Sequence, residues 1–151
     1  MAPVNVKPKF WRFTNKVSWK GEKKGLVAAR DKPSLEVATP VDFGGHEGTW
    51  TPEDLFLASV NSCIMTTFLY YRAKAGFELI SYQSTVEGLV EFAPQGLAFT
   101  RVMVRPEIVV GAALARNQAE QALRHAEERC LISNSVKAQI VVEPHIKASR
   151  Q

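Results

Sequence analysis

The chain contains two cysteines, Cys63 and Cys130, and they are its first candidates for chemistry. A thiolate can act as a nucleophile or a metal ligand, whereas a buried thiol behaves as a small apolar side chain. Cys63 closes the stretch "TPEDLFLASVNSC", in which the carboxylate Glu53 comes ten residues earlier. Cys130 lies in "ERCLISNSVK", where a helix is expected to end in a turn rich in serine and asparagine. A lone cysteine within a helix is more often a core residue than a nucleophile.

The side chains expected around Cys63 favour a chemical role for this cysteine. Ser59 and Thr67 lie four residues to either side, so a helix places their hydroxyl groups on the face of the thiol. Phe56 and Val60 add apolar surface to that face. Such a mixture suits a thiol that meets a partly apolar substrate. Cys63 is therefore a candidate nucleophile as well as a candidate core residue.

Metal and cofactor sites are not expected. The three histidines His46, His125 and His145 are scattered, and no pair among them and the cysteines has zinc-finger spacing. The segment "GGHEG" lacks the strand, turn and helix that surround a dinucleotide-binding loop. It is interpreted as a turn, with His46 exposed at its tip.

Length and composition indicate one globular domain over residues 1–151. The chain is 46% apolar and 23% charged, which allows a substantial core. No stretch predicts a signal peptide or a membrane span, so the expected location is the cytoplasm and no membrane partner is expected. A reducing compartment argues against a structural disulfide, although a redox pair stays possible.

Positive charge is concentrated at the start of the chain. Residues 1–32 carry nine Lys or Arg against Glu22 and Asp31, although the whole chain has a net charge of only +4. The arm could be a solvated edge hairpin that resists aggregation, a nucleic-acid contact, or a source of positive charge for a thiolate. No aromatic RNA-binding signature or recognition helix accompanies it, so no nucleic-acid partner is expected.

The pattern of the elements predicts an α+β fold. Strand-like segments at 4–19, 26–30 and 34–38 predict an N-terminal meander over about 1–45, followed by a loop. Thr51 is a natural N-cap, Pro52 suits the first helical position and Gly76 suits the stop, which predicts a long central helix over about 51–75.

The rest of the chain, about 80–145, is predicted to hold strands and a second helix. The strand-like segments are 81–92, 99–110 and 136–146. The helix is expected at 112–129, and four alanines form a stripe along it that would let another helix approach closely. These alanines are Ala115, Ala119, Ala122 and Ala126.

Two stretches taken together resemble a known family. "GGHEGTWTPEDLFLASVNSC" and "AEERCLISNSVKAQIVV" are similar to the OsmC/Ohr family of thiol-dependent peroxidases. The motifs occur in the same order as in the family, and the resemblance extends from about residue 40 to 144. The shared features are a GG loop, Pro-Glu at a helix start, a cysteine ten residues after that glutamate, and a second cysteine before "SNS".

The resemblance implies an activity in the oxidative stress response. Cys63 would be the peroxidatic cysteine that attacks an organic hydroperoxide or hydrogen peroxide and becomes a sulfenic acid. Cys130 would be the resolving cysteine, whose disulfide with Cys63 an external dithiol reduces. Glu53 would orient an arginine that supports the thiolate. The implied fold is an α+β intertwined homodimer, with antiparallel sheets of both subunits around two long central helices.

One departure from the family pattern concerns that arginine. The comparable stretch "WKGEKKGLVAARDK" offers Lys23 and Lys24, and Arg30 does not align cleanly. A lysine lacks the planar fork with which an arginine can meet a carboxylate and a thiolate together. This departure suggests a subgroup whose best substrate differs from that of the Ohr enzymes. The alternative function is a non-enzymatic protein of the same fold, which binds a small molecule or senses redox state. We expect Lys23, Lys24 or Arg30 to lie near the Cys63 sulfur.

Helix geometry constrains the position of Glu53. Ten residues of α-helix rise roughly 15 Å, so Glu53 cannot touch Cys63 of its own chain while both remain helical. A shared site would need the glutamate of a second copy, with the long helices antiparallel about a two-fold axis. The sequence therefore predicts a homodimer in which Glu53 acts in trans.

Overall fold

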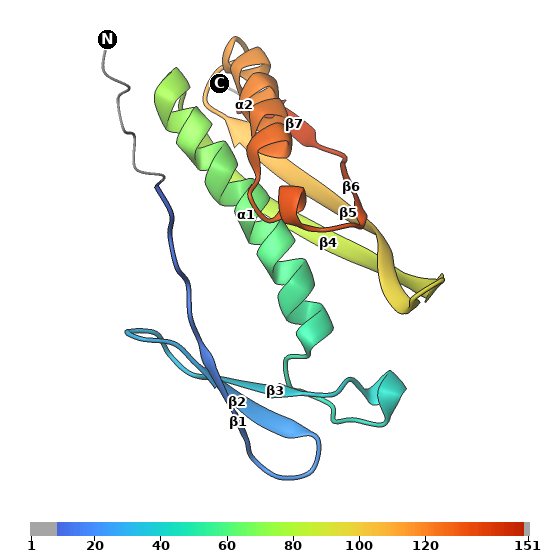
Figure 1. The fold of residues 1–151 in the computed structure, drawn as a ribbon. Coiled ribbons are helices and arrows are strands. Elements are labelled where there is room, and N and C mark those ends of the chain that lie inside the picture. Colours follow the sequence, from blue (N-terminus) through green and yellow to red (C-terminus); the bar gives the residue numbers. More distant parts are fainter. Residues whose placement is uncertain (1–8, 150–151) are drawn as a thin grey trace, which may run out of the picture. The chain divides into compact units, whose positions relative to one another are not determined.

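The structure is a computed structural model that describes residues 9–149, and it divides into two compact units (Figure 1). The units are Met1–Pro52 and Glu53–Gln151. Each is described by itself below. The single domain expected for residues 1–151 stays a prediction.

The first unit contains a small antiparallel sheet of three strands. These are β1 (Lys16–Trp19), β2 (Lys24–Ala28) and β3 (Leu35–Ala38), in the order β1-β2-β3. A short 3₁₀ helix, η1 (Val41–Phe43), follows in the loop. The predicted strand at 34–38 is confirmed, whereas the strand predicted at 26–30 begins and ends two residues earlier.

The predicted strand at 4–19 is much longer than the observed one. Residues 1–8 lie outside the described part of the chain, and residues 9–15 form no strand. Pairing beyond Lys16 would require β2 to continue past Ala28, but the chain turns there, with Lys32 donating to the Ala29 carbonyl. Asp31 has a φ of 59°, which interrupts an extended backbone.

A long helix opens the second unit. The helix α1 spans Pro52–Ala75, so the predicted central helix is confirmed. Gly76 ends it with a φ of 75°, and its N–H donates to the Arg72 carbonyl at 2.9 Å. This left-handed conformation is one that glycine adopts without a steric penalty.

The sheet of the second unit is built on a long hairpin. The strands β4 (Leu79–Ala93) and β5 (Gly96–Val110) pair antiparallel, which confirms and extends the predicted strands at 81–92 and 99–110. The strands β6 (Gln139–Val142) and β7 (His145–Ala148) both pair parallel with β5.

The predicted strand at 136–146 was wrong as one continuous element. Between β6 and β7, Glu143 donates its N–H to the Val104 carbonyl, whereas Pro144 has no N–H to donate. Pairing with β5 therefore stops at Pro144 and resumes at His145.

The second helix, α2, spans Ala115–Arg129 and begins three residues later than predicted. Residues 112–114 form a turn instead, in which the Ala115 N–H donates to the Ala112 carbonyl at 3.0 Å. A short 3₁₀ helix, η2 (Ser133–Ser135), follows. Within residues 9–149, no helix is both long enough and apolar enough to cross a membrane.

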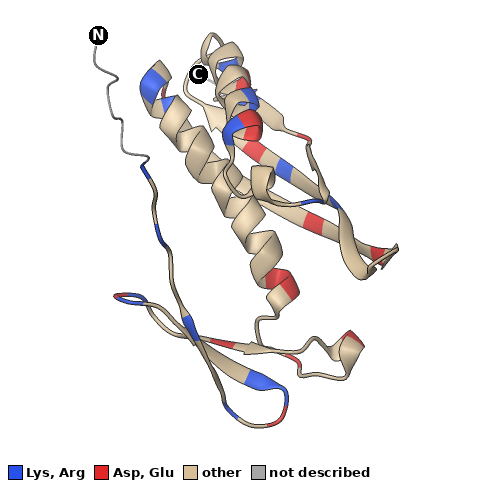
Figure 2. Ribbon diagram, viewed as in Figure 1, with Lys and Arg blue, Asp and Glu red and all other residues tan. Residues whose placement is uncertain are grey.

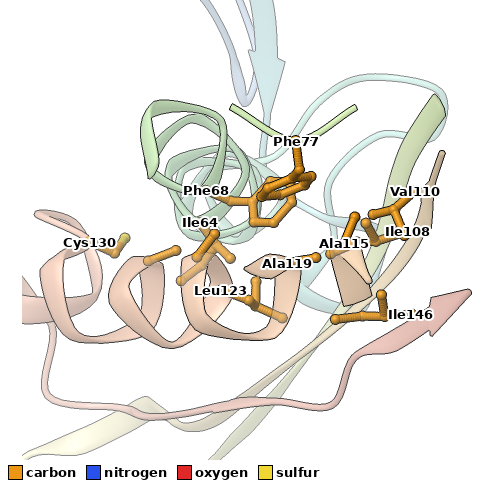
Figure 3. Close-up of a cluster of buried hydrophobic side chains, with 12 residues drawn as sticks. Ile64, Phe68, Phe77, Ile108, Val110, Ala115, Ala119, Leu123, Cys130 and Ile146 are labelled. Carbon is orange, nitrogen blue, oxygen red and sulfur yellow. The ribbon is translucent and has the colours of Figure 1, made fainter. Parts of the chain in front are cut away.

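The alanine stripe of α2 is buried in a core cluster that also contains side chains of α1. Figure 3 shows Ile64 and Phe68 of α1 above α2, with Ala119 and Leu123 beneath them. All four of these side chains are at most 1% exposed. The same core includes the inward residues of β5 and β7, namely Ile108, Val110 and Ile146. Both helices therefore pack on one face of the sheet.

The full burial of Ala119 in this core predicts a low tolerance for a larger side chain there. We expect Ala119→Leu to lower the free energy of unfolding by about 1–3 kcal/mol, because added volume in a packed core forces strain. Gln118→Leu is the matched control. Gln118 is next to Ala119 in the chain, but its side chain is exposed, so a leucine there has room. Urea unfolding measures both variants, and an equal loss in the two would contradict this packing.

Candidate active site

The two cysteines come together because α1 and α2 run antiparallel. Cys63 lies near the middle of α1, and Cys130 follows the last residue of α2. Cys63 packs against the core cluster that contains Cys130. Further along the same helix pair, the ring of Tyr71 stacks on His125 with centroids 4.9 Å apart. Both thiols are free.

Cys130 is fully buried and is held as a neutral thiol. Burial raises its pKa above the ordinary value, because a thiolate is poorly solvated in an apolar core. The adjacent Cys63 thiol raises the pKa further, whereas Ser133 lowers it. The net direction is upward. Cys130 is thus less readily ionised than an ordinary cysteine.

Cys63 has a different environment, since its residue is half-buried. Its sulfur lies 4.0 Å from the Thr67 hydroxyl, so the predicted neighbour one turn along is confirmed. The Ser59 hydroxyl instead donates to the Phe56 carbonyl of the helix backbone at 2.7 Å. Of the two cysteines, Cys63 is the residue with solvent-exposed surface.

Glu53 lies at the start of α1, one of two acids in its first turn. Its Oε2 atom is buried and has no hydrogen-bond partner within residues 9–149. A buried carboxylate oxygen without a partner is costly, so a donor or cation is expected to meet it. The helix separates Glu53 from Cys63 by roughly 15 Å of rise. The structure therefore brings Cys130, and not Glu53, to the Cys63 of the same chain.

The basic arm makes interactions inside the first unit. Lys23 donates from Nζ to the carbonyls of Gly44 and Phe43, at 2.9 and 3.3 Å. Arg30 pairs with Asp31 at 3.5 Å, and both side chains are almost fully exposed. The expectation that a cation of this arm lies near Cys63 stays a prediction.

His46 differs from its expected exposure. Its side chain is only 28% exposed, and its Nε2 lies 3.3 Å from a carboxylate oxygen of Glu22. The loop around it is tightly folded, because a Cβ on Gly45 would lie 1.6 Å from the Thr39 carbonyl oxygen. Within residues 9–149, no group of three or more His, Cys, Asp or Glu is arranged to hold a metal.

Two polar features of the site were missed by the sequence analysis. Asn61 and Ser84 join α1 to β4, with the Ser84 hydroxyl donating to Asn61 Oδ1 at 2.5 Å and Asn61 Nδ2 donating to the Ser84 carbonyl at 3.3 Å. Ser133 donates its N–H to the Cys130 sulfur at 3.4 Å. The available signal for Ser133 was its place three residues after a cysteine that ends a helix.

Comparison with known proteins identifies the family of the chain. The model of the OsmC-like protein family matches residues 44–145, which include both cysteines and Glu53. The chain belongs to the OsmC-like protein family. Its predicted α+β fold with two helices and two sheets is therefore confirmed, although the second sheet is mixed and not antiparallel throughout, because β6 and β7 pair parallel with β5.

Similar proteins come from several bacteria. The chain is 24% identical over 106 residues to peroxiredoxin OsmC of Escherichia coli, which covers 70% of this chain and 73% of that protein. Its fold matches an OsmC-like protein of unknown function from Vibrio cholerae, with a TM-score of 0.82, 23% identity, and coverage of 90% of this chain and 100% of that one. An organic hydroperoxide resistance protein OsmC from Legionella pneumophila matches with a TM-score of 0.67, 25% identity, and coverage of 91% and 98%.

The unequal burial of the two thiols predicts unequal alkylation of this OsmC-like protein. A short treatment with iodoacetamide at neutral pH should label Cys63 and leave Cys130 unmodified, because only thiolates react and Cys130 is buried with a raised pKa. In Cys63→Ser, labelling of Cys130 should start only at a pH above the ordinary thiol pKa of about 8.5.

Peptide mass spectrometry measures the labelling, and the urea-unfolded protein is the control in which both cysteines should react. Equal labelling of the folded protein at neutral pH would contradict this assignment.

Proposed function

We propose that this OsmC-like protein is a thiol-dependent peroxidase that reduces organic hydroperoxides or hydrogen peroxide. The observation that carries the proposal is the pair formed by a half-buried Cys63 and a buried Cys130. The accessible thiol would meet the peroxide, and the buried thiol is already beside it. The names of the Escherichia coli peroxiredoxin and the Legionella hydroperoxide resistance protein support the same reaction class.

The reaction has three steps. The Cys63 thiolate attacks the distal oxygen of the hydroperoxide, the O–O bond breaks, and the alkoxide takes a proton and leaves as an alcohol. Cys63 is then a sulfenic acid. The Cys130 sulfur attacks the Cys63 sulfur, the S–O bond breaks, and the departing hydroxide takes the Cys130 proton and forms water. An external dithiol reduces the resulting disulfide and is itself oxidised to a disulfide.

The order of these steps follows from burial. A peroxidatic thiol has to be a thiolate and accessible, whereas a resolving thiol should stay protonated until the sulfenic acid forms. The raised pKa of Cys130 keeps it from competing for peroxide. Cys63 is therefore the first nucleophile and Cys130 the second.

Substitution of each cysteine tests the cycle. One equivalent of cumene hydroperoxide should convert the reduced protein to an intramolecular Cys63–Cys130 disulfide. Cys63→Ser should abolish turnover, because no peroxidatic thiol remains. Cys130→Ser should react once and stop at a sulfenic acid that further peroxide over-oxidises.

Stopped-flow kinetics and intact-mass measurements distinguish these results, with hydrogen peroxide as the comparison substrate. No disulfide after treatment would sink the two-cysteine cycle. A disulfide that forms slowly and does not turn over with a dithiol would favour redox sensing over catalysis.

We further propose that the working form is a homodimer. Figure 2 shows charged residues only at the two ends of α1. No charged residue lies between Asp54 and Arg72, and apolar side chains occur all around the helix. A helix of this kind is normally enclosed, yet only Val60, Ile64 and Phe68 are fully buried. A second α1 packed antiparallel on it would supply the missing cover.

The unpaired Glu53 supports the same arrangement. Two antiparallel α1 helices related by a two-fold axis would bring Glu53 of each chain towards Cys63 of the other. The buried carboxylate would then hold a cation of the basic arm beside the thiol, which would favour the thiolate. Each dimer would contain two equivalent sites.

Mixed dimers test the action of Glu53 in trans. Cys63→Ser and Glu53→Gln are each expected to be inactive, but refolding an equal mixture should recover about a quarter of the wild-type activity. Half of the dimers are then mixed, and each mixed dimer holds one intact site. A control mixture of Cys63→Ser with Cys130→Ser should recover nothing, because both thiols of a site come from one chain.

Steady-state peroxidase assays after refolding measure the recovery, and analytical ultracentrifugation checks the dimer. A monomer at working concentration, or no recovery with Glu53→Gln, would rule this arrangement out.

A further inference from the structure

The turn after α2 wraps closely around Cys130. The Asn134 N–H donates to the Cys130 carbonyl at 3.0 Å, and Asn134 Nδ2 donates to the Glu128 carbonyl at 3.2 Å. The Ser135 hydroxyl donates to the Leu131 carbonyl at 2.7 Å. These bonds fix the backbone on both sides of the cysteine. The Cys130 sulfur therefore has a defined position in the core, at the end of the cluster in Figure 3.

Ser133 directs two hydrogen-bond donors into the surroundings of this sulfur. Its N–H donates to the Cys130 sulfur at 3.4 Å, and its hydroxyl is buried without a partner within residues 9–149. A neutral thiol is a weak acceptor, whereas a thiolate is a strong one. The buried hydroxyl can be satisfied by turning towards a thiolate. The Ser133 N–H already lowers the pKa of Cys130 against the larger effect of burial.

The two sulfurs also differ in access. A thiol that reduces a disulfide has to approach one sulfur along the S–S axis, while the other sulfur leaves as a thiolate. Cys130 is 0% exposed, whereas Cys63 is half-buried. Approach is therefore open only at Cys63. The leaving sulfur is then the one beside Ser133.

We propose that reduction of the Cys63–Cys130 disulfide is directional, with the external thiol attacking Cys63 and Ser133 stabilising Cys130 as the leaving thiolate. This inference rests on the proposed two-cysteine cycle. Ser133 is a positioning residue, because it acts through the Cys130 sulfur and touches no substrate. Its donors are set before the charge appears, so little rearrangement is needed when the S–S bond breaks.

The electrons and protons balance in two exchanges. The reductant's thiolate forms a bond to the Cys63 sulfur, the S–S bond breaks, and its electron pair remains on Cys130. The second thiol of the reductant, as a thiolate, then attacks the reductant's own sulfur and releases Cys63 as a thiolate. The reductant becomes a cyclic disulfide. Cys130 takes up a proton and returns to its neutral form.

Trapping of the mixed disulfide tests the direction. The Cys63–Cys130 disulfide is prepared with diamide, so that it does not depend on peroxidase activity. It is treated briefly with 2-mercaptoethanol, quenched with N-ethylmaleimide in urea so that the buried Cys130 can react, and mapped by peptide mass spectrometry. Mercaptoethanol should be found on Cys63 and maleimide on Cys130.

Substitutions in the turn test the role of Ser133. Ser133→Ala should slow reduction by 2-mercaptoethanol about fivefold, because the leaving thiolate loses one donor. Ser133→Thr keeps a hydroxyl and should restore most of the rate. Ser135→Ala is the matched control, because it removes a hydrogen bond from the same turn without facing the sulfur.

A thiolate titration separates this role from a merely structural one. In the Cys63→Ser background, ultraviolet absorbance should show a higher Cys130 pKa after Ser133→Ala and an unchanged one after Ser135→Ala.

The outcomes distinguish the inference from the proposed function. A mixed disulfide on Cys130, or equal rates and pKa values for the Ser133→Ala and Ser135→Ala variants, would overturn the inference and leave the peroxidase cycle standing. Failure of diamide to form any intramolecular disulfide would overturn both.

Discussion

The packing of α1 against the alanine stripe of α2 is the constraint on which the rest of the second unit depends. The distance between two packed helices is set by the side chains at their contact, and alanine allows a short one. A disulfide needs Cα atoms about 5–6 Å apart, which two helices reach only where their backbones come close or where one of them ends. Cys130 satisfies the second condition because it follows the last residue of α2, and the stripe belongs to the core cluster against which Cys63 packs.

Elements marked by local signals were predictable from the sequence, and contacts between distant segments were not. The bounds of α1 follow from Pro52 and Gly76, which act on the backbone within a turn of their own positions. The break between β6 and β7 was also signalled, because Pro144 stands inside the segment that was interpreted as one strand. The pairing of Cys63 with Cys130 joins positions 67 residues apart in the chain (130 − 63), and only the resemblance to a family suggested it.

The two cysteines show how burial alone can assign different roles to one type of side chain. Neither lies at a helix N-terminus, where the backbone would favour a thiolate. Cys130 instead lies in a buried environment that disfavours a thiolate. Ser133 opposes this effect, because its N–H donates to the Cys130 sulfur. The sequence shows a serine near a cysteine, but a buried hydroxyl without a partner is a property of the fold. The proposed role of Ser133 could therefore be inferred only from the structure.

The parallel strands have a consequence for how the chain acquires its native state. Both β6 and β7 pair with β5 only after the chain has crossed over the sheet through α2. The paired residues, such as Arg101 and Gln139, are therefore 38 positions apart in the sequence. Contacts of such separation form slowly, because a long loop has to close before any pairing is gained. The hairpin β4–β5 can form early, while Cys130 gains its enclosure late. We therefore expect a newly made chain to expose Cys130 until α2 and the strands that follow it have packed on the sheet.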